Sequence, residues 1–468
     1  METLTSPPPT SIENAHFDAK RRFFDSGHTR TYSYRIAQLK ALLKGIERHE
    51  DAISKAVFQD LHKSEAEAYI TEIAVTKEEI KHTLNHLREW MQAEKRNTPL
   101  VLQPSSSRII YEPKGVVLII APWNYPFQLA IAPLIGAIAA GNCAVVKPSE
   151  EAPATAVVIE TLINDMFSND YISVVQGLGH EVVPAMMKAH DFNHIFFTGS
   201  PAVGSIVAKQ AADKLTPTTL ELGGKSPGIV DASADLKTAA RRLVFAKFTN
   251  AGQTCVAPDY LLLHSSIKDK FLAEAKKCIV DFYGKDPQKS KDYGRMVNSK
   301  RFNAVSALIG DGTVIYGGQT DAADKYIAPT LIEGADLDSP VMQEEIFGPV
   351  WPVHVWNERK DLLEITRRMR YPLACYVFTT DKATEKLVTE QVEFGGGCVN
   401  NALLHLANPD LPFGGVQESG SGNYHGWHSF AAFSHTKSIL KSATWIDPRM
   451  KYPPFGKWKL GWLKRLMG

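Results

Sequence analysis

Short apolar runs, separated by segments with helical periodicity, organise much of the first half of the chain. The first run is Val116-Val117-Leu118-Ile119-Ile120, and a continuous run of this kind is typical of a parallel strand buried on both faces. Similar runs occupy 143–146, 172–175 and 194–197, while 155–166 has the pattern of a helix. Strands that alternate with helices predict a doubly wound α/β unit.

The pattern continues on both sides of this unit. Upstream, 34–93 carries apolar residues at helical spacing, which predicts a layer of helices. Downstream, Gly223-Gly224 marks a turn, and strand-like runs follow at 261–263, 314–316 and 374–378. The sequence therefore predicts an α/β fold in which a second α/β unit follows the turn.

The most apolar window, 127–146, is interrupted by Pro133, Gly136 and Gly141 and leads directly into Lys147. We therefore expect a buried helix followed by a strand, and no membrane span. Residues 1–20 lack a basic segment followed by an apolar one, which argues against a secretory signal.

Charge and cysteine content narrow the class of protein. The 468 residues include 52 basic and 51 acidic ones, a net charge of +1, which gives nucleic-acid binding no electrostatic support. The five cysteines are odd in number and form no Cys-x-x-Cys pair, so free thiols in a reducing, cytoplasmic compartment are expected. No cysteine, histidine and carboxylate cluster has zinc-like spacing, and no metal is expected.

A loop of small residues ends on a cysteine in the segment Phe248-Thr249-Asn250-Ala251-Gly252-Gln253-Thr254-Cys255. A thiolate can attack a carbonyl carbon, and Gly252 permits a close backbone approach. A free thiol is only a few per cent ionised at neutral pH, so a nucleophile here requires surroundings that favour the thiolate. The alternative is a small buried core cysteine, which is the expectation for the other four cysteines.

A carboxylate stands beside the glycine turn in the segment Leu220-Glu221-Leu222-Gly223-Gly224-Lys225-Ser226-Pro227. Glu221 lies at the end of an expected strand, where a glutamate can act as general base for a hydrolytic water. The alternative is a solvated turn residue. A thiol and a carboxylate together suit covalent attack on a carbonyl followed by hydrolysis.

Three further positions carry candidate chemistry. Asn124, in Pro122-Trp123-Asn124-Tyr125-Pro126-Phe127, can donate a hydrogen bond to an oxyanion or serve only as a turn residue. The loop Thr198-Gly199-Ser200-Pro201-Ala202-Val203-Gly204 follows a strand and opens a helix, as a pyrophosphate-binding loop does, although its Gly-x4-Gly spacing is unusual. Lys147 ends another strand, where it can reach ribose hydroxyls or remain an ordinary exposed lysine.

The chain resembles the aldehyde dehydrogenase superfamily in these segments and in two more, Glu345-Ile346-Phe347-Gly348-Pro349-Val350 and Pro412-Phe413-Gly414-Gly415-Val416. The short N-terminus and the Trp-Asn-Tyr-Pro-Phe segment are most similar to the class 3 branch, which includes fatty aldehyde dehydrogenases. The resemblance implies two doubly wound α/β domains, one NAD-binding and Rossmann-like and one catalytic, with a small bridging and oligomerisation element. The implied activity is NAD(P)-dependent oxidation of aldehydes to carboxylic acids through a cysteine thiohemiacetal and a thioester.

The resemblance also implies domain boundaries. The N-terminal helices and the dinucleotide-binding domain would comprise 1–97 and 112–222, and the catalytic domain would comprise 223–402. The bridging, oligomerisation and substrate-entrance segments would be 98–111 and 403–448, and a basic, aromatic tail would follow at 449–468.

By resemblance, Cys255 is the nucleophile, and Asn124 holds the oxyanion together with the Cys255 backbone N–H. Glu221 is the base that activates water, and Glu345 is a second base in class 3 enzymes. Glu221 disfavours a coenzyme A-acylating enzyme, because such members generally lack a base at this position. A non-catalytic, structural family member is the remaining alternative, and the joint presence of these residues speaks against it.

The implied cofactor is NAD, with NADP as the alternative. By resemblance, Glu345 holds the nicotinamide ribose and Phe347 packs beside the nicotinamide, while the charge of Glu150 disfavours a 2′-phosphate. The expected cofactor-binding residues are Lys147, Glu150, Thr198, Gly199, Ser200, Gly204, Leu222, Gly223, Glu345 and Phe347.

The class 3 resemblance and the tail favour medium- or long-chain aliphatic aldehydes as substrates, with aromatic or apocarotenoid-type aldehydes as the alternative. Tyr125, Asn423 and His425 are expected at the substrate entrance. For Asn423 and His425, a glycine-rich loop that merely packs is an equal alternative.

The tail, 449–468, contains six basic residues, no acidic residue and the aromatic residues Tyr452, Phe455, Trp458 and Trp462. It is too short and too charged to span a bilayer, but a basic segment with tryptophans can lie in the interface of anionic lipid. Peripheral membrane contact is therefore a hypothesis beside the cytoplasmic location, and packing of the tail against a partner subunit is the alternative. A homodimer is the class 3 expectation, with a tetramer as the alternative.

Overall fold

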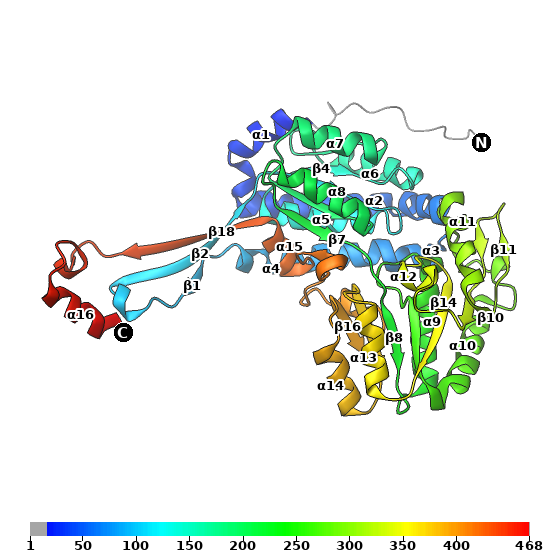
Figure 1. Ribbon diagram of the computed structural model, residues 1–468. Coiled ribbons are helices and arrows are strands. Elements are labelled where there is room, and N and C mark those ends of the chain that lie inside the picture. The colour runs from blue at the N-terminus through cyan, green and yellow to red at the C-terminus, as the bar shows by residue number, and fades with distance from the viewer. Residues whose placement is uncertain (1–15, 468) are drawn as a thin grey trace.

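The structure, a computed structural model, describes residues 16–467 and contains two α/β sheets from which a long arm projects (Figure 1). Residues 1–15 and 468, which belong to the predicted N-terminal domain and tail, lie outside the described residues.

The first sheet contains all four of the predicted apolar runs. Its order is β17-β7-β6-β3-β4-β5, and its neighbours are parallel except at the edge strand β17. The strand order reverses between β3 and β6, and such a switch point opens a crevice at the carboxyl ends of the strands. The strands are β3 (Val116–Ile120), β4 (Cys143–Lys147), β5 (Ile172–Val174), β6 (His194–Thr198), β7 (Thr218–Glu221) and β17 (Gly420–Ser421).

Helices cover both faces of this sheet. The N-terminal helix α2 contacts α5 and α6 on one face, whereas α8 packs on β6 and β7 with α7 beside it; right-handed crossovers require this arrangement. The helices of this half are α1 (Phe17–Asp25), α2 (Tyr32–Leu61), α3 (Glu65–Ala68), a π-helical segment (Tyr69–Ile73), α4 (Ala74–Trp90), α5 (Gln128–Ala140), α6 (Pro153–Met166), α7 (Gly179–Ala189), α8 (Pro201–Ala212) and α15 (Gly426–Ala432).

The second sheet has the order β10-β13-β14-β9-β8-β15-β16, parallel except at β10. It is buried on both faces, because Leu261 and Leu263 belong to one apolar core and the intervening Leu262 to another. This confirms the predicted fold of two α/β units. The strands are β8 (Pro227–Val230), β9 (Tyr260–His264), β10 (Thr313–Tyr316), β13 (Thr330–Glu333), β14 (Val350–Trp356), β15 (Ala374–Phe378) and β16 (Gly396–Val399), with β11 (Thr320–Asp321) and β12 (Tyr326–Ile327) as a separate pair. The helices are α9 (Leu236–Phe248), α10 (Lys268–Tyr283), α11 (Ser299–Ala307), α12 (Pro340–Gln343), α13 (Arg359–Arg368) and α14 (Lys382–Gln391).

The carboxyl edge of the first sheet meets the amino edge of the second. Thr198 and Glu221 end β6 and β7, whereas Gly223, Cys255 and Glu345 precede β8, β9 and β14. Gly223 lies directly against the Glu345 carboxyl, since a Cβ atom at Gly223 would be 2.0 Å from Glu345 Oε2. The predicted chemical groups therefore converge where the two sheets face each other.

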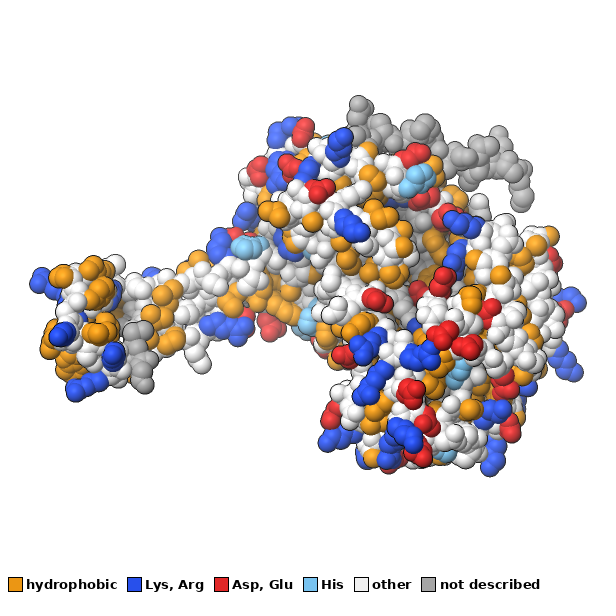
Figure 2. Space-filling view, in the orientation of Figure 1, with side chains coloured by type: hydrophobic (Ala, Val, Ile, Leu, Met, Phe, Trp, Pro, Cys, Tyr) orange, Lys and Arg blue, Asp and Glu red, His pale blue; other side chains and the backbone are white. Residues whose placement is uncertain are grey.

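The arm is a three-stranded antiparallel sheet of β1 (Glu94–Arg96), β2 (Ser105–Pro113) and β18 (Ser434–Ser442). Strands β2 and β18 pair over their whole length, from Ser434 opposite Pro113 to Ser442 opposite Ser105. Between β1 and β2, Leu100–Leu102 forms a 3-10 turn. At its tip lies α16 (Lys457–Met467), where apolar and basic side chains gather (Figure 2). No helix within residues 16–467 is long and apolar enough to cross a membrane.

Candidate active site

Cys255 lies in a turn between α9 and β9, directly after a strained stretch of backbone. Asn250, Ala251 and Gly252 have φ values of 53°, 50° and 76°. This left-handed region is unfavourable for residues with a Cβ atom, and such strain is often found at functional loops. At Gly252 a side chain is excluded outright, because a Cβ atom would lie 2.4 Å from the Gly348 carbonyl oxygen. The predicted close backbone approach at Gly252 is therefore present.

The side chain of Gln253 holds this loop in place. Its Nε2 donates to the carbonyl oxygens of Asn250 (3.0 Å) and Arg295 (2.9 Å), and its Oε1 accepts from the Val297 N–H (3.0 Å). On the other side of the cysteine, the Tyr376 hydroxyl donates to the Val256 carbonyl oxygen at 2.7 Å. Cys255 is thus presented by a backbone that is fixed on both sides.

Glu221 is a buried carboxyl group without a hydrogen-bond partner. Its side chain is 2% exposed, and neither oxygen has a partner among the described residues. Burial raises the pKa of Glu221 well above its usual value, which favours the neutral form of the carboxyl. An unpaired buried carboxyl is costly to folding, and a buried carboxyl with a raised pKa is a candidate for a catalytic role.

Glu345 is the second buried carboxyl at this point. It accepts a hydrogen bond from the Gly224 N–H, while burial and the nearby Asp259 raise the pKa of Glu345 to about 8. Asp259 also accepts from the Ile346 N–H (3.2 Å) and forms an ion pair with Lys225 (2.6 Å). A buried charged cluster therefore holds the backbone next to Glu345.

The surroundings of Cys255 do not favour its thiolate. Burial first, and then the Glu345 and Glu221 carboxyls, raise the pKa of the Cys255 thiol to about 12. Surroundings that favour the thiolate, which a nucleophile here requires, are therefore not provided by this arrangement. A thiol with such a pKa reacts as a nucleophile only when a base removes its proton, and Glu345 is a base of suitable strength.

Asn124 lies beside the loop that carries Cys255. Its buried side-chain amide donates to the Gln253 carbonyl oxygen at 3.1 Å, two residues before the cysteine. The neighbouring Tyr125 hydroxyl shares a hydrogen bond of 2.6 Å with Thr254 Oγ1. The loop that follows β3 therefore reaches the cysteine from the first sheet.

The crevice at the switch point of the first sheet fits a dinucleotide pyrophosphate. Ser200 caps the N-terminus of α8 by accepting from the Val203 N–H (3.4 Å), and helix N-termini bind phosphate. Gly199 lies close to Phe197, whose ring would be 2.6 Å from a Cβ atom at Gly199, so a side chain would fill this cradle. Thr198 Oγ1 is buried and has no partner among residues 16–467. Gly204, one turn into α8, packs against Leu222.

Lys147, at the end of β4, forms an ion pair with Glu150. Glu150 also accepts from the N–H of Gly179, the first residue of α7, at 2.7 Å. A lysine and a carboxylate are therefore fixed together at the carboxyl end of β4. In the loop before β14, Phe347 (φ 49°) packs edge-on against Trp123, with ring centroids 5.2 Å apart.

The two C-terminal residues expected at the substrate entrance differ in their surroundings. His425 is buried, stacks on Tyr424, and has its Nδ1 3.6 Å from Glu79 Oε2. Asn423 is exposed and lies against Gly414. Within residues 16–467 no group of three His, Cys, Asp or Glu side chains could hold a metal ion, and all five cysteines are free.

Known proteins match both the sequence and this geometry. The model of the aldehyde dehydrogenase family matches residues 7–439. The 4,4'-diaponeurosporen-aldehyde dehydrogenase of Staphylococcus aureus is 46% identical over 451 residues, covering 96% of this chain and 98% of that protein. The dimeric NADP-preferring aldehyde dehydrogenase of dog is 44% identical over 437 residues, covering 93% of this chain and 96% of that protein. A solved structure of Staphylococcus aureus AldH in a substrate-bound state has a TM-score of 0.94 and 44% identity, and covers 98% of this chain and all (100%) of that chain.

The chain belongs to the aldehyde dehydrogenase family. It is an NAD(P)-dependent aldehyde oxidoreductase, and its cofactor is NAD or NADP as in the family. The cofactor, when bound, supplies the hydride acceptor.

Several buried or half-buried charged residues near this site were not predicted from the sequence. Lys63, Glu67 and Glu72 contact the loops that carry Asn124 and Cys255. Lys247, fully buried, lies 3.6 Å from Asp259. Their sequence signal is weak, because charged residues within helices are usually solvent-exposed.

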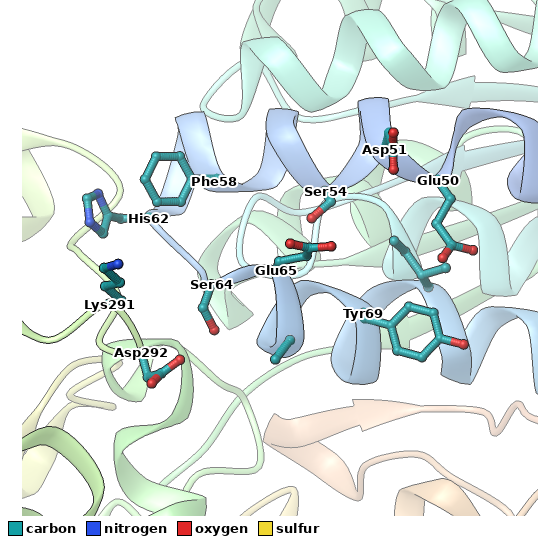
Figure 3. A pocket seen from close by; sticks show the side chains of 12 residues that line it. Glu50, Asp51, Ser54, Phe58, His62, Ser64, Glu65, Tyr69, Lys291 and Asp292 are labelled. Atoms are coloured by element: carbon teal, nitrogen blue, oxygen red, sulfur yellow. The ribbon is translucent and has the colours of Figure 1, made fainter.

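A surface groove of about 820 Å³ lies outside the catalytic centre, between α2 and the segment 64–73 (Figure 3). Its lining includes none of the predicted catalytic residues. The lining residues are Glu50, Asp51, Ser54, Phe58, His62, Ser64, Glu65, Ala66, Tyr69, Ile73, Lys291 and Asp292.

The raised pKa of Cys255 predicts how the free enzyme reacts with iodoacetamide. Because the pKa is about 12, the thiolate fraction should rise about tenfold per pH unit from pH 7 to 10 without reaching a plateau. The alkylation rate, corrected for the background measured with Cys255→Ala, should follow this fraction. A rate that levels off by pH 10, as expected for an ordinary thiol with a pKa of about 8.5, would contradict the described surroundings of the thiol.

Proposed function

We propose that this enzyme oxidises medium- or long-chain aliphatic aldehydes to free carboxylic acids, with Cys255 as the nucleophile. The observation that carries the proposal is the convergence of two buried carboxyls, Glu221 and Glu345, on one cysteine. Both carboxyls lie near enough to the Cys255 thiol for their charges to raise its pKa. Covalent catalysis followed by hydrolysis requires a base in each half of the reaction.

In the first half, the ionised Glu345 carboxylate takes the thiol proton, and Cys255 Sγ bonds to the aldehyde carbon. The carbonyl oxygen becomes an oxyanion in the thiohemiacetal, and the Asn124 side-chain amide and the Cys255 backbone N–H hold it. Glu345 suits this step because a pKa of about 8 leaves part of the population ionised at neutral pH and makes the ionised form a competent base.

The thiohemiacetal becomes a thioester when its C–H hydrogen leaves as a hydride, which the nicotinamide cofactor would accept when bound. In the second half, the thioester on Cys255 is hydrolysed. Glu221 acts as the base that takes a proton from the attacking water, and the Cys255 thiol leaves as the carboxylic acid forms. Glu221 must be ionised for this step. The water that enters the site hydrates the Glu221 carboxyl and thereby lowers the pKa that burial raises. The base at this position favours water over coenzyme A as the acyl acceptor.

A polyene aldehyde is the second candidate substrate. The relative that is 46% identical is named a 4,4'-diaponeurosporen-aldehyde dehydrogenase, and such a substrate shares a long apolar chain with fatty aldehydes. Both classes differ from short aldehydes in chain length, and each buried methylene contributes about 0.8 kcal/mol to binding.

For the cofactor we propose NAD over NADP. Glu150 is held at the end of the crevice by Lys147 and the Gly179 N–H, and a fixed carboxylate there repels a 2′-phosphate. The dog relative is named NADP-preferring, so NADP is the competing outcome. The residues proposed to hold the dinucleotide are those predicted from the sequence, which include Thr198, Ser200 and Phe347.

The first test is turnover of straight-chain aldehydes from short to long, with an aromatic and a polyene aldehyde alongside. NAD and NADP are run in parallel without coenzyme A, and reduced cofactor is followed by absorbance. We expect kcat/KM to rise about fourfold per methylene until the passage is filled, with NAD the better cofactor. Cys255→Ala should lose more than about 10³-fold of the rate while still binding NAD. Wild-type turnover in that variant, or no turnover of any aldehyde by the wild type, would contradict the proposal.

Replacement of Glu221 separates the two halves of the reaction. Glu221→Gln removes the base for water but leaves attack by Cys255, so we expect a burst of NADH equal to the active sites. A steady-state rate about 10²–10⁴-fold below wild type should follow. Stopped-flow absorbance measures both phases. Loss of the burst would mean that Glu221 acts earlier, on the thiol.

We further propose that the enzyme is a homodimer and that its tail contacts a membrane surface. The name of the dog relative includes "dimeric". Near the arm tip, Trp458, Phe455 and Trp445 are 68%, 61% and 79% exposed, and the tail carries six basic residues and no acidic one. Exposed tryptophans with basic neighbours suit the interface of anionic lipid.

Deletion of 449–468 tests the membrane proposal. With vesicles of phosphatidylserine and phosphatidylcholine, we expect the full chain to co-sediment at low salt and the deletion variant to remain in solution. Turnover of a short, soluble aldehyde should be the same in both. Trp458→Ser/Trp462→Ser is the matched control that keeps the charge. Unchanged sedimentation, or loss of the dimer on size exclusion, would instead assign the tail to the partner subunit.

A further inference from the structure

One short segment, 63–73, lies between the surface groove and the catalytic loops. Its outer side carries Ser64, Glu65 and Tyr69, which line the groove (Figure 3). Its inner side carries Lys63, Glu67 and Glu72, none of which lines the groove. The segment therefore presents different groups to the solvent and to the active site.

Lys63 and Glu72 form a fully buried ion pair that grips the loop of Asn124. Lys63 Nζ donates to Glu72 Oε1 at 2.7 Å and to the Asn124 carbonyl oxygen at 2.9 Å, and it lies 3.8 Å from the centre of the Tyr125 ring. The second oxygen of Glu72 accepts from the N–H groups of Phe127 and Gln128, each at 3.0 Å. The middle and the C-terminal end of the loop that presents Asn124 are thus held by one pair of charges.

Glu67 forms a hydrogen bond with the loop that leads to Cys255. Its Oε1 accepts from the Asn250 N–H at 2.7 Å, at the first residue of the left-handed stretch that leads to Cys255. Asn250 in turn donates from Nδ2 to the Asn124 carbonyl oxygen at 2.8 Å. The Asn124 carbonyl oxygen therefore accepts hydrogen bonds both from Lys63 of the segment and from Asn250 of the Cys255 loop.

The π-helical turn at Tyr69–Ile73 explains how Glu67 and Glu72 both reach inward. In an α-helix, two residues five positions apart point about 140° away from each other. The wider turn of a π-helix brings such residues closer to one face, and π-turns of this kind occur frequently at functional sites.

Stability alone does not account for the buried pair. Taking Lys63 and Glu72 out of water is costly, and an uncharged pair of similar volume is often as stable or more so. The two charged groups provide directional hydrogen bonds instead, because the lysine donates to two acceptors and the carboxylate accepts from two N–H groups.

We propose that Lys63 and Glu72 are positioning residues for the oxyanion donor Asn124, and that Glu67 is a positioning residue for the Cys255 loop. The inference rests on the proposed roles of Asn124 and Cys255. It assigns a function to the segment 63–73 in the oxidation of aldehydes, although none of the three residues touches the reacting atoms.

The deciding variant is Lys63→Met/Glu72→Gln, which removes both charges and keeps both volumes. We expect its melting temperature to stay close to that of the wild type and KM to change less than about threefold, while kcat falls at least tenfold, because a misplaced oxyanion donor costs up to about 10³-fold. Alkylation of Cys255 by iodoacetamide forms no oxyanion, so its rate should stay within about twofold of the wild type.

Glu67→Leu is the second variant, at a half-buried position. It leaves the Asn250 N–H without its acceptor, so both kcat and the alkylation rate of Cys255 should change. Glu65→Gln, on the outer side of the same segment, is the matched control and should leave every readout within about twofold.

Wild-type kcat in a folded Lys63→Met/Glu72→Gln variant would overturn the role of the ion pair, and wild-type kcat and alkylation in Glu67→Leu would overturn that of Glu67. A wild-type enzyme that oxidises no aldehyde in the same assay would instead overturn the proposed function.

Discussion

The direct contact of Gly223 with the Glu345 carboxyl sets the distance between the two sheets. A side chain at Gly223 would overlap this carboxyl, since the Cβ position lies 2.0 Å from Oε2. Because Gly223 has no side chain, the amino edge of the second sheet can approach the carboxyl edge of the first. Residues that end strands in one sheet, such as Glu221, then face residues that precede strands in the other, such as Cys255. The active site is therefore a consequence of how two parallel sheets meet.

This close approach also buries ionisable groups, and burial has two consequences. It raises the pKa of Glu221, Glu345 and Cys255, which keeps the thiol protonated until a base acts on it. It also strengthens the ion pairs nearby, because charges interact more strongly away from water. Lys63–Glu72 and Lys225–Asp259 are both buried and both hold backbone next to a candidate catalytic group. The site thus combines a thiol and two carboxyls, whose neutral forms are favoured by burial, with ion pairs that hold the nearby backbone.

The arm has a different physical character from the body. Its strands β2 and β18 join parts of the chain that are more than 300 residues apart in the sequence, as the bond between Ser105 and Ser442 illustrates. A three-stranded sheet that projects from the body leaves apolar residues such as Leu100 (88% exposed) and Trp445 without cover. Exposed apolar clusters of this kind mark surfaces that bind another molecule, which is the basis for the dimer and membrane proposals.

The sequence alone determined the layered α/β fold, because a parallel strand buried on both faces is mostly apolar, and β3, β4, β5 and β6 are buried at every position and apolar at most of them. It also indicated the reactive residue types, since a thiol after a small-residue loop and a glutamate before a glycine turn are local features. Strands β16 and β17 were missed, because Gly396–Val399 and Gly420–Ser421 carry no apolar run and pair only by tertiary contact. Only the tertiary structure decided the pKa of Cys255 and the hydrogen bond of Glu67 with Asn250, 183 residues away. Burial and electrostatic neighbours exist only once distant segments have packed together.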